Sequence, residues 1–145
     1  MSEDPVRANS FMLDVQKVGK AYFREASGFG SHNEVIENWL QSDKGVTVRT
    51  VQPGNMKWDT INLKRGITSD QALWKWRKQV IDGQVVAARS DGTITGFDEK
   101  GDPKIQYSFT NGWPSKWSAS GMNAGGGDVV MEEIEIAHEG LVRLL

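Results

Sequence analysis

One stretch of the 145-residue sequence, TSDQALWKWRKQVIDG, has clear α-helical start and stop signals. Thr68 and Gln71 have the spacing of a capping box, in which each side chain bonds the backbone of the other residue. Asp70 adds a negative charge to the expected first turn, where the helix dipole favours it. Gly83 follows at the point where a helix favours a left-handed residue. The sequence therefore predicts one helix at about 69–82.

The predicted helix has one strongly apolar face. Leu73, Trp76 and Val80 are spaced at i, i+3 and i+7, so they lie on the same side. Trp74 and Ile81 belong to a second, mixed stripe, which indicates a second neighbour. We expect the helix to lie on a β-structure, because the remaining sequence reads as strands and turns.

Apolar and polar residues alternate over several segments with the period of two that is typical of half-buried strands. These segments are 11–15, 46–51, 58–65, 105–109 and 130–138. Together with the single helix they predict a mainly β fold, in which two antiparallel sheets pack as a sandwich or barrel. We expect one domain over 1–145, with a flexible arm at about 1–9.

Turn signals divide these strands. Asp91-Gly92 stands between two strand-like runs, 85–89 and 93–97, and predicts a hairpin at 90–92. Pro53-Gly54-Asn55 is expected to interrupt a strand. The run NAGGGD at 123–128 is expected to form an exposed loop.

Composition excludes several classes of protein. The chain has no cysteine, which removes disulfides, zinc–thiolate sites and thiol catalysis and fits a reducing cytoplasm. Its net charge of −2 gives no long-range attraction to nucleic acid or anionic membranes. No apolar run approaches the roughly 20 residues of a membrane span. The polar N-terminal sequence is unlike a signal peptide, so we expect no membrane insertion.

Residues for catalysis or metal binding are sparse. The two histidines, His32 and His138, stand far apart in the sequence, and His138 falls on the apolar side of the last expected strand. Glu133 and Glu135 form the polar side of that strand. The glycine run at 125–127 lacks the lysine of a phosphate-binding loop. We expect no catalytic residues, no cofactor and no metal.

Two alternative functions stay open. One is a small hydrolase that uses His138 with a glutamate, and the other is a carbohydrate- or nucleic-acid-binding β-domain that uses the six tryptophans.

Three segments together resemble one known family. They are FREASGFGS (23–31), LKRGITSDQALWKW (63–76) and FTNGWPSKWSASGMNAGGGDVVMEEIEIAHEGL (109–141). This combination is similar to the tail tube proteins of contractile phages, a family that includes the inner tube proteins of phage-tail-like contractile injection systems. The segments follow the order and the spacing of that family.

The resemblance implies a structural subunit rather than an enzyme. Six subunits would form a ring, and rings would stack into a hollow tube that conducts DNA or effector cargo. The implied partners are other copies of the chain, a surrounding sheath protein, a baseplate or spike hub, and terminator or cap proteins. The tube would assemble in the bacterial cytoplasm and become part of a virion tail or a released phage-tail-like particle.

The segment 41–58 has few residues able to anchor it to its own core. An isolated two-stranded extension is marginal in water, so we expect this segment to become ordered only against neighbouring subunits. The candidates for contacts between subunits or rings are Asp43, Lys44, Arg49, Lys57, Gly125, Gly126 and Gly127. Thr47 and Arg49 are candidates for the surface of the lumen.

Overall fold

The structure is a computed structural model that describes residues 10–122, 124–126 and 129–145. The segment 1–9, predicted to be a flexible arm, lies outside the described residues. Within them the elements follow in the order β1 (Ser10–Val15), β2 (Gly19–Phe23), β3 (Glu25–Ser27), β4 (Ser31–Gln41), β5 (Thr47–Trp58), β6 (Ile61–Gly66), α1 (Ala72–Ile81), α2 (Val85–Ala88), β7 (Ser90–Phe97), β8 (Pro103–Ala119), β9 (Met131–Ala137) and β10 (Gly140–Arg143).

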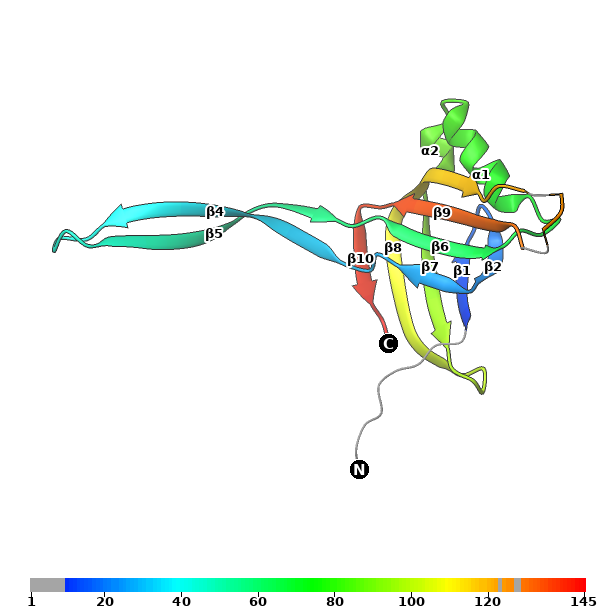
Figure 1. Cartoon of the computed structure of the whole chain (residues 1–145), viewed down its shortest axis with the longest axis horizontal. Coiled ribbons are helices and arrows are strands. Elements are labelled where there is room, and N and C mark those ends of the chain that lie inside the picture. The colour runs from blue at the N-terminus through cyan, green and yellow to red at the C-terminus, as the bar shows by residue number, and fades with distance from the viewer. Residues whose placement is uncertain (1–9, 123, 127–128) are drawn as a thin grey trace.

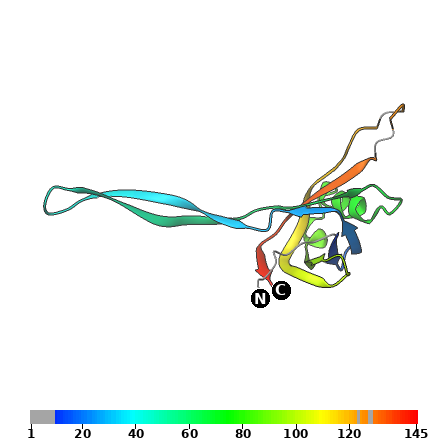
Figure 2. The same ribbon diagram turned by 60° about the horizontal axis from the view of Figure 1, so that its bottom comes forward.

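Strand β8 joins the two halves of the main sheet. The strand order is β2-β1-β7-β8-β9-β6-β3, with β10 paired to β8 outside this path, and all neighbours are antiparallel. The first part of β8 pairs with β7 and β10, and its last part pairs with β9. A left-handed Asn111 (φ 50°) and a register shift between Pro114 and Lys116 mark the change of partners. The two halves therefore face each other, as Figures 1 and 2 show.

The core lies between these halves. The inward residues of β1, β2, β7 and β8 meet those of β6 and β9, and the alternation seen in the sequence sets which residues point inward. The largest of these fully buried side chains are Leu13, Ile94, Phe109, Ile61, Leu63, Ile134 and Ile136. The predicted mainly β fold of two packed antiparallel sheets is confirmed, and the sheet is not closed into a barrel.

Helix α1 begins later than the sequence predicts. It starts at Ala72, and Gln71 at its N-cap makes no side-chain capping hydrogen bond, so the predicted capping box is wrong. Instead, the Thr68 hydroxyl accepts a hydrogen bond from the Asp70 N–H at 3.2 Å, and the Asp70 carboxylate accepts one from the Ala72 N–H at 3.0 Å. These short polar turns lead the chain into the helix. Gly83 has a positive φ of 85°, as expected after a helix end.

Both predicted stripes of α1 have neighbours. Leu73 and Trp76 are buried in the core, and the Trp76 indole Nε1 donates a hydrogen bond to the Ala88 carbonyl at 2.7 Å. Trp74 packs against Trp117 of β8, with ring centroids 5.0 Å apart. The helix is thus fixed to the sheet through two faces.

The hairpin predicted at 90–92 does not form. Residues 85–88 form the short helix α2 rather than a strand, and β7 already begins at Ser90. Gly92 lies inside β7, where a Cβ atom would come within 2.6 Å of the Phe109 ring and 2.7 Å of Val15. The glycine is required there by close packing, and the sequence reading mistook it for a turn residue.

Candidate functional site

Strands β4 and β5 form a long hairpin, residues 31–58, which we call the arm. It extends far from the rest of the molecule in both ribbon views (Figures 1 and 2). The two strands pair only with each other within the described chain, and every residue of β4 is exposed. A hairpin of this length without a covering layer cannot be explained by the stability of a free subunit.

The arm carries large apolar side chains on both of its faces. Cross-strand partners share a face. Val35, Trp39 and Val51 therefore lie on one side, which we call the Trp39 face. Ile36, Leu40 and Val48 lie on the other side, the Leu40 face.

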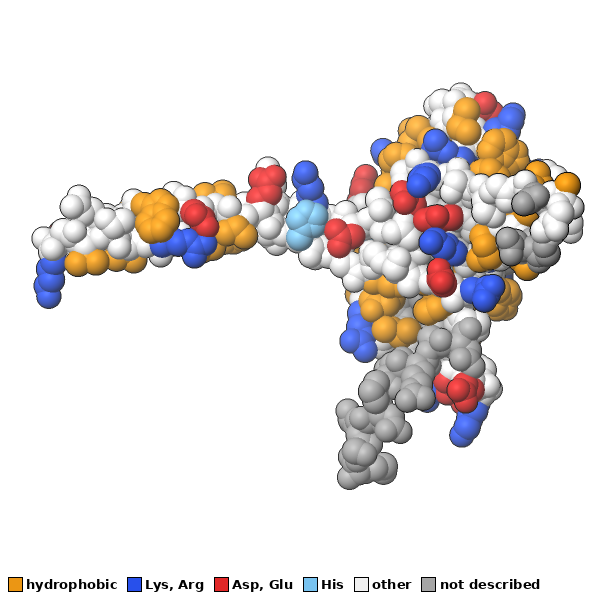
Figure 3. Space-filling model, viewed as in Figure 1, with side chains coloured by type: hydrophobic (Ala, Val, Ile, Leu, Met, Phe, Trp, Pro, Cys, Tyr) orange, Lys and Arg blue, Asp and Glu red, His pale blue; other side chains and the backbone are white. Residues whose placement is uncertain are grey.

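These six side chains are all exposed, Trp39 to 63% and Leu40 to 58%. Figure 3 shows apolar side chains along both margins of the arm. Several exposed large apolar side chains on one element are typical of an interaction surface. Since it occurs on both faces, the arm has two surfaces that need cover.

A β-bulge divides the arm near its base. The register shifts between Asn33 and Val35, and the Asn33 amide donates a hydrogen bond to the Gly54 carbonyl at 3.2 Å. A Cβ atom at Gly54 would lie 3.1 Å from the Glu34 backbone oxygen. Pro53-Gly54-Asn55 therefore accommodates the bulge inside β5, and the predicted interruption of the strand is wrong. Proline is tolerated there because the outer edge of the hairpin has no ladder to complete.

Four of the predicted contact residues lie on the arm. Asp43 and Lys44 occupy the turn at its tip, which is closed by a hydrogen bond from Ser42 N–H to the Val46 carbonyl at 2.8 Å. Arg49 pairs with Glu37 across the strands. Lys57 lies opposite His32 near the base.

The predicted lumen-facing residues, Thr47 and Arg49, lie on the Trp39 face of the arm. That face combines the Arg49–Glu37 ion pair with exposed Trp39 and Val51, so it is not uniformly polar. The position of these residues in a lumen stays a prediction.

Gly125 and Gly126, two of the three predicted glycine contacts, lie outside the arm. Gly125 and Gly126 are exposed in the connection between β8 and β9, and Gly127 lies outside the described residues. Figure 2 shows this connection extending from the other side of the body. The structure does not bring Gly125 and Gly126 together with the predicted contacts of the arm in one copy.

Both histidines contact Asp59, which connects the arm to β6. His32 Nδ1 lies 3.2 Å from Asp59 Oδ1, and His138 Nε2 donates to the Asp59 backbone carbonyl at 3.0 Å. The His138 ring also packs near the rings of Trp58 and Phe109. These contacts hold the base of the arm on the body, which is a structural role.

The remaining polar groups form no catalytic constellation among the described residues. Arg65 and Glu132 form a buried ion pair in the core at 2.7 Å, and the Trp117 indole donates to the second Glu132 oxygen at 3.1 Å. Hydrogen bonds from the backbone N–H groups of Asp102 and Lys100 lower the pKa of the Asp98 carboxyl in the β7–β8 turn. In the described part of the chain no three His, Asp or Glu side chains are arranged to hold a metal ion.

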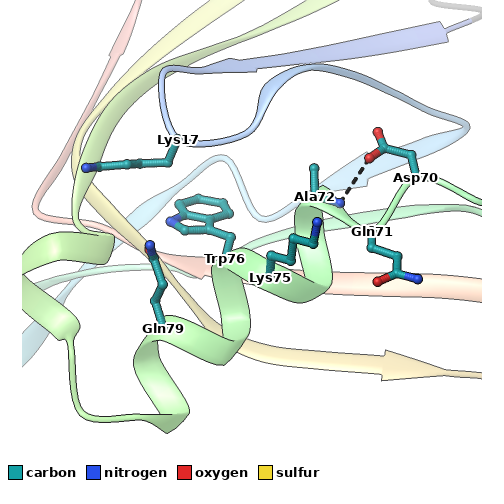
Figure 4. Close-up of a pocket in the computed structure, with 7 residues that line it drawn as sticks. All are labelled: Lys17, Asp70, Gln71, Ala72, Lys75, Trp76 and Gln79. Carbon is teal, nitrogen blue, oxygen red and sulfur yellow. Dashed lines mark hydrogen bonds between the residues drawn. The ribbon is translucent and has the colours of Figure 1, made fainter.

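A hollow of about 220 Å³ lies beside α1. Figure 4 shows Lys17, Lys75 and Gln79 around the edge of the buried Trp76, and the Asp70 carboxylate bonded to the Ala72 N–H. The charged groups there are solvated side-chain ends of mixed sign. The hollow offers no nucleophile paired with a base among its lining residues.

The tryptophans are not gathered on one surface. Trp76 is in the core, Trp74 contacts Trp117, Trp58 lies at the base of the arm, and Trp39 is exposed on the arm. A shared stacking platform for sugars or bases needs these rings side by side.

None of the described helices is long and apolar enough to cross a membrane.

The fold has close counterparts among solved structures. In the PVC sheath–tube complex of an extracellular contractile injection system, the matching chain has a TM-score of 0.74 at 18% identity, with 98% of this chain and 93% of that chain covered. The matching chain of the PVC sheath/tube terminator has a TM-score of 0.75 at 18% identity, with 100% of each chain covered. A type six secretion system protein has a TM-score of 0.69 at 17% identity, with 94% of this chain and 83% of that chain covered.

At these identities the likeness shows the fold. Comparison of the sequence with curated proteins finds no significant match. A sequence model of the family described as T4-like virus tail tube protein gp19 matches residues 7–142, nearly the whole chain. The chain therefore belongs to the T4-like virus tail tube protein gp19 family.

Proposed function

We propose that this chain is the subunit of the inner tube of a contractile phage tail or phage-tail-like injection system. Six copies form a ring, and stacked rings form a hollow tube that conducts DNA or effector cargo. The observation that carries the proposal is the arm, which exposes apolar side chains on both faces and has no covering element among the described residues.

The energetics of the arm favour assembly. Full burial of one large apolar side chain contributes roughly 1.5–3 kcal/mol, and each arm exposes eight of them. Repeated around a ring, this burial offsets the loss of translational and rotational freedom on association. Neighbouring copies therefore provide the cover that the free subunit lacks.

The solved relatives support the proposed partners. Their structures are a sheath–tube complex, a sheath/tube terminator, a tube-terminating cap and a baseplate. We infer that the tube made by this chain is enclosed by a sheath, ends at a terminator or cap, and stands on a baseplate or spike hub. It assembles in the bacterial cytoplasm and acts as a passive conduit without catalytic activity.

Electron microscopy of the purified protein tests the proposal. The wild-type chain should form rings or hollow tubes. The variant Val35→Ser/Trp39→Ser/Val51→Ser removes the apolar groups of the Trp39 face and should stay folded but fail to form tubes. Val86→Ser, an exposed apolar position on α2, is the matched control and should assemble normally.

The same variants separate assembly from folding. Thermal melts should show no loss of stability in the triple variant, since its three positions lie outside the core. Normal tubes from the triple variant would contradict the role of the arm. A large drop in melting temperature would show that the arm serves the fold of the single subunit instead.

A further inference from the structure

A groove lies in the body of the molecule, between β2 and the chain that leads from the end of β6 into α1 (Figure 1). Among the described strands β2 pairs only with β1, and because the sheet is not closed into a barrel, the outer edge of β2 has no strand beside it. The volume of the groove is about 520 Å³. Binding sites for small molecules have volumes of roughly 300–1,000 Å³, so the groove is large enough to hold one.

Positive charge predominates in the groove. Lys20 and Arg24 line it, are exposed, and form no ion pair with any described residue. The one carboxylate in its lining, that of Asp70, accepts a hydrogen bond from a backbone N–H at the start of α1. Arg65 also lines the groove, and Glu132 balances its charge in the core. Lys20 and Arg24 therefore supply an excess of positive charge, which favours an anionic ligand.

Arg65 gives the groove a fixed hydrogen-bond donor. Its side chain is 9% exposed, its Nε donates to Glu132 Oε1 at 2.7 Å, and its guanidinium carbon lies 5.5 Å from the centre of the Phe23 ring. Nη2 of the same guanidinium is buried and has no hydrogen-bond partner among the described residues. Buried polar groups of folded proteins are nearly always paired. This donor, held in place by the core, distinguishes the groove from a surface that carries only solvated cations.

We propose that the groove is a binding site for a phosphate group, either free inorganic phosphate or the phosphate of a small molecule such as a nucleotide. Arginine and lysine are the side chains that bind phosphate oxygens, and a guanidinium matches their geometry. Arg65 Nη2 supplies the buried donor, and Lys20 and Arg24 balance the negative charge. Tyr22, which is 59% exposed, also lines the groove and offers an aromatic ring to an attached organic group. The site goes beyond the proposed tube function and does not depend on it.

Isothermal titration calorimetry on the purified full-length chain tests the proposal. Sodium phosphate, AMP and adenosine are titrated separately at constant ionic strength. Phosphate and AMP should bind at one site per chain, and adenosine, which lacks the phosphate, should not bind. Added sodium chloride should weaken the binding of both anions, because salt screens the attraction between charges. Tighter binding of AMP than of phosphate would identify a ligand with an organic group, and equal binding would identify the free anion.

A pair of double variants locates the site. Lys20→Gln/Arg24→Gln should weaken phosphate binding by about tenfold or more, because it removes two charge-assisted contacts from exposed positions. Lys17→Gln/Lys75→Gln is the matched control, since it changes the net charge equally but alters the hollow beside α1 (Figure 4). The control should keep the affinity of the wild-type chain.

Three results would overturn the proposal. They are the absence of phosphate binding to the wild-type chain, binding of adenosine as tight as that of AMP, and an equal loss of phosphate binding in the two double variants. The third result would mean that phosphate responds to the net charge of the chain rather than to this groove.

Discussion

Trp76 is the residue that fixes α1 to the sheets. It is 2% exposed and its indole bonds the Ala88 carbonyl. Trp76→Ala should therefore lower the free energy of unfolding by about 3–5 kcal/mol in denaturant titrations. Trp39→Ala on the arm is the matched control and should change it by less than about 0.5 kcal/mol. A loss below about 1 kcal/mol for Trp76→Ala would mean that the helix face is not a core contact.

The Arg65–Glu132 ion pair gives a second prediction at this scale. Glu132→Ala leaves the Arg65 guanidinium buried without its counter-ion and should cost about 3–5 kcal/mol of stability. Glu133→Ala, one position along on the outer face of β9, should change stability by about 0.5 kcal/mol or less. Similar losses from the two variants would argue against the buried pair.

The sequence contained the signal for this ion pair. Along β9, Glu132 falls on the same side as the inward residues Ile134 and Ile136, because side chains alternate between the two faces of a strand. Along β6, Arg65 falls on the same side as Ile61 and Leu63. A charged residue on the buried side of a strand needs a partner. The inward position of Glu132 was not used in the sequence-based prediction, so the pair was missed.

At the scale of elements, strands with clean alternation were predicted well and glycine-rich segments were not. The last strand was predicted at 130–138 and forms as β9, because alternation alone decides which face is buried. The prediction of a hairpin at 90–92 was wrong because Gly92 lies inside a strand, where it allows close packing against Phe109. Local patterns cannot distinguish a glycine needed for a turn from one needed for close approach.

The arm was predictable only in part. The strand at 46–51 and the poor anchoring of 41–58 were predicted from the sequence, and the structure shows the corresponding hairpin. The apolar character of both faces became clear only from the cross-strand register. The bulge at Asn33 and Val35 sets that register, and a single sequence does not specify it.

The loop between β8 and β9 carries a prediction about assembly. Its glycines, of which Gly125 and Gly126 are described and exposed, allow close approach of another backbone. Replacing Gly125, Gly126 and Gly127 with alanines should reduce tube formation in electron micrographs more than it lowers the melting temperature. If both fall equally, the loop serves the fold rather than a contact between rings.

At the scale of the whole molecule, the fold consists of a body that buries its own apolar side chains and an arm that does not. The body buries its own core between two half-sheets and α1. The arm makes one strand pair and exposes both faces. A free subunit therefore bears the cost of ordering the arm without compensating burial, which neighbouring copies would supply in the proposed tube.

Hydrogen exchange on residues 41–58, compared between the soluble subunit and assembled tubes, tests this claim most directly. Backbone amides there should exchange rapidly in the soluble subunit, since local opening exposes little buried surface. They should become strongly protected in tubes, while amides of the core strands β6 and β9 are protected in both states. Equal and strong protection of 41–58 in both states would contradict the account.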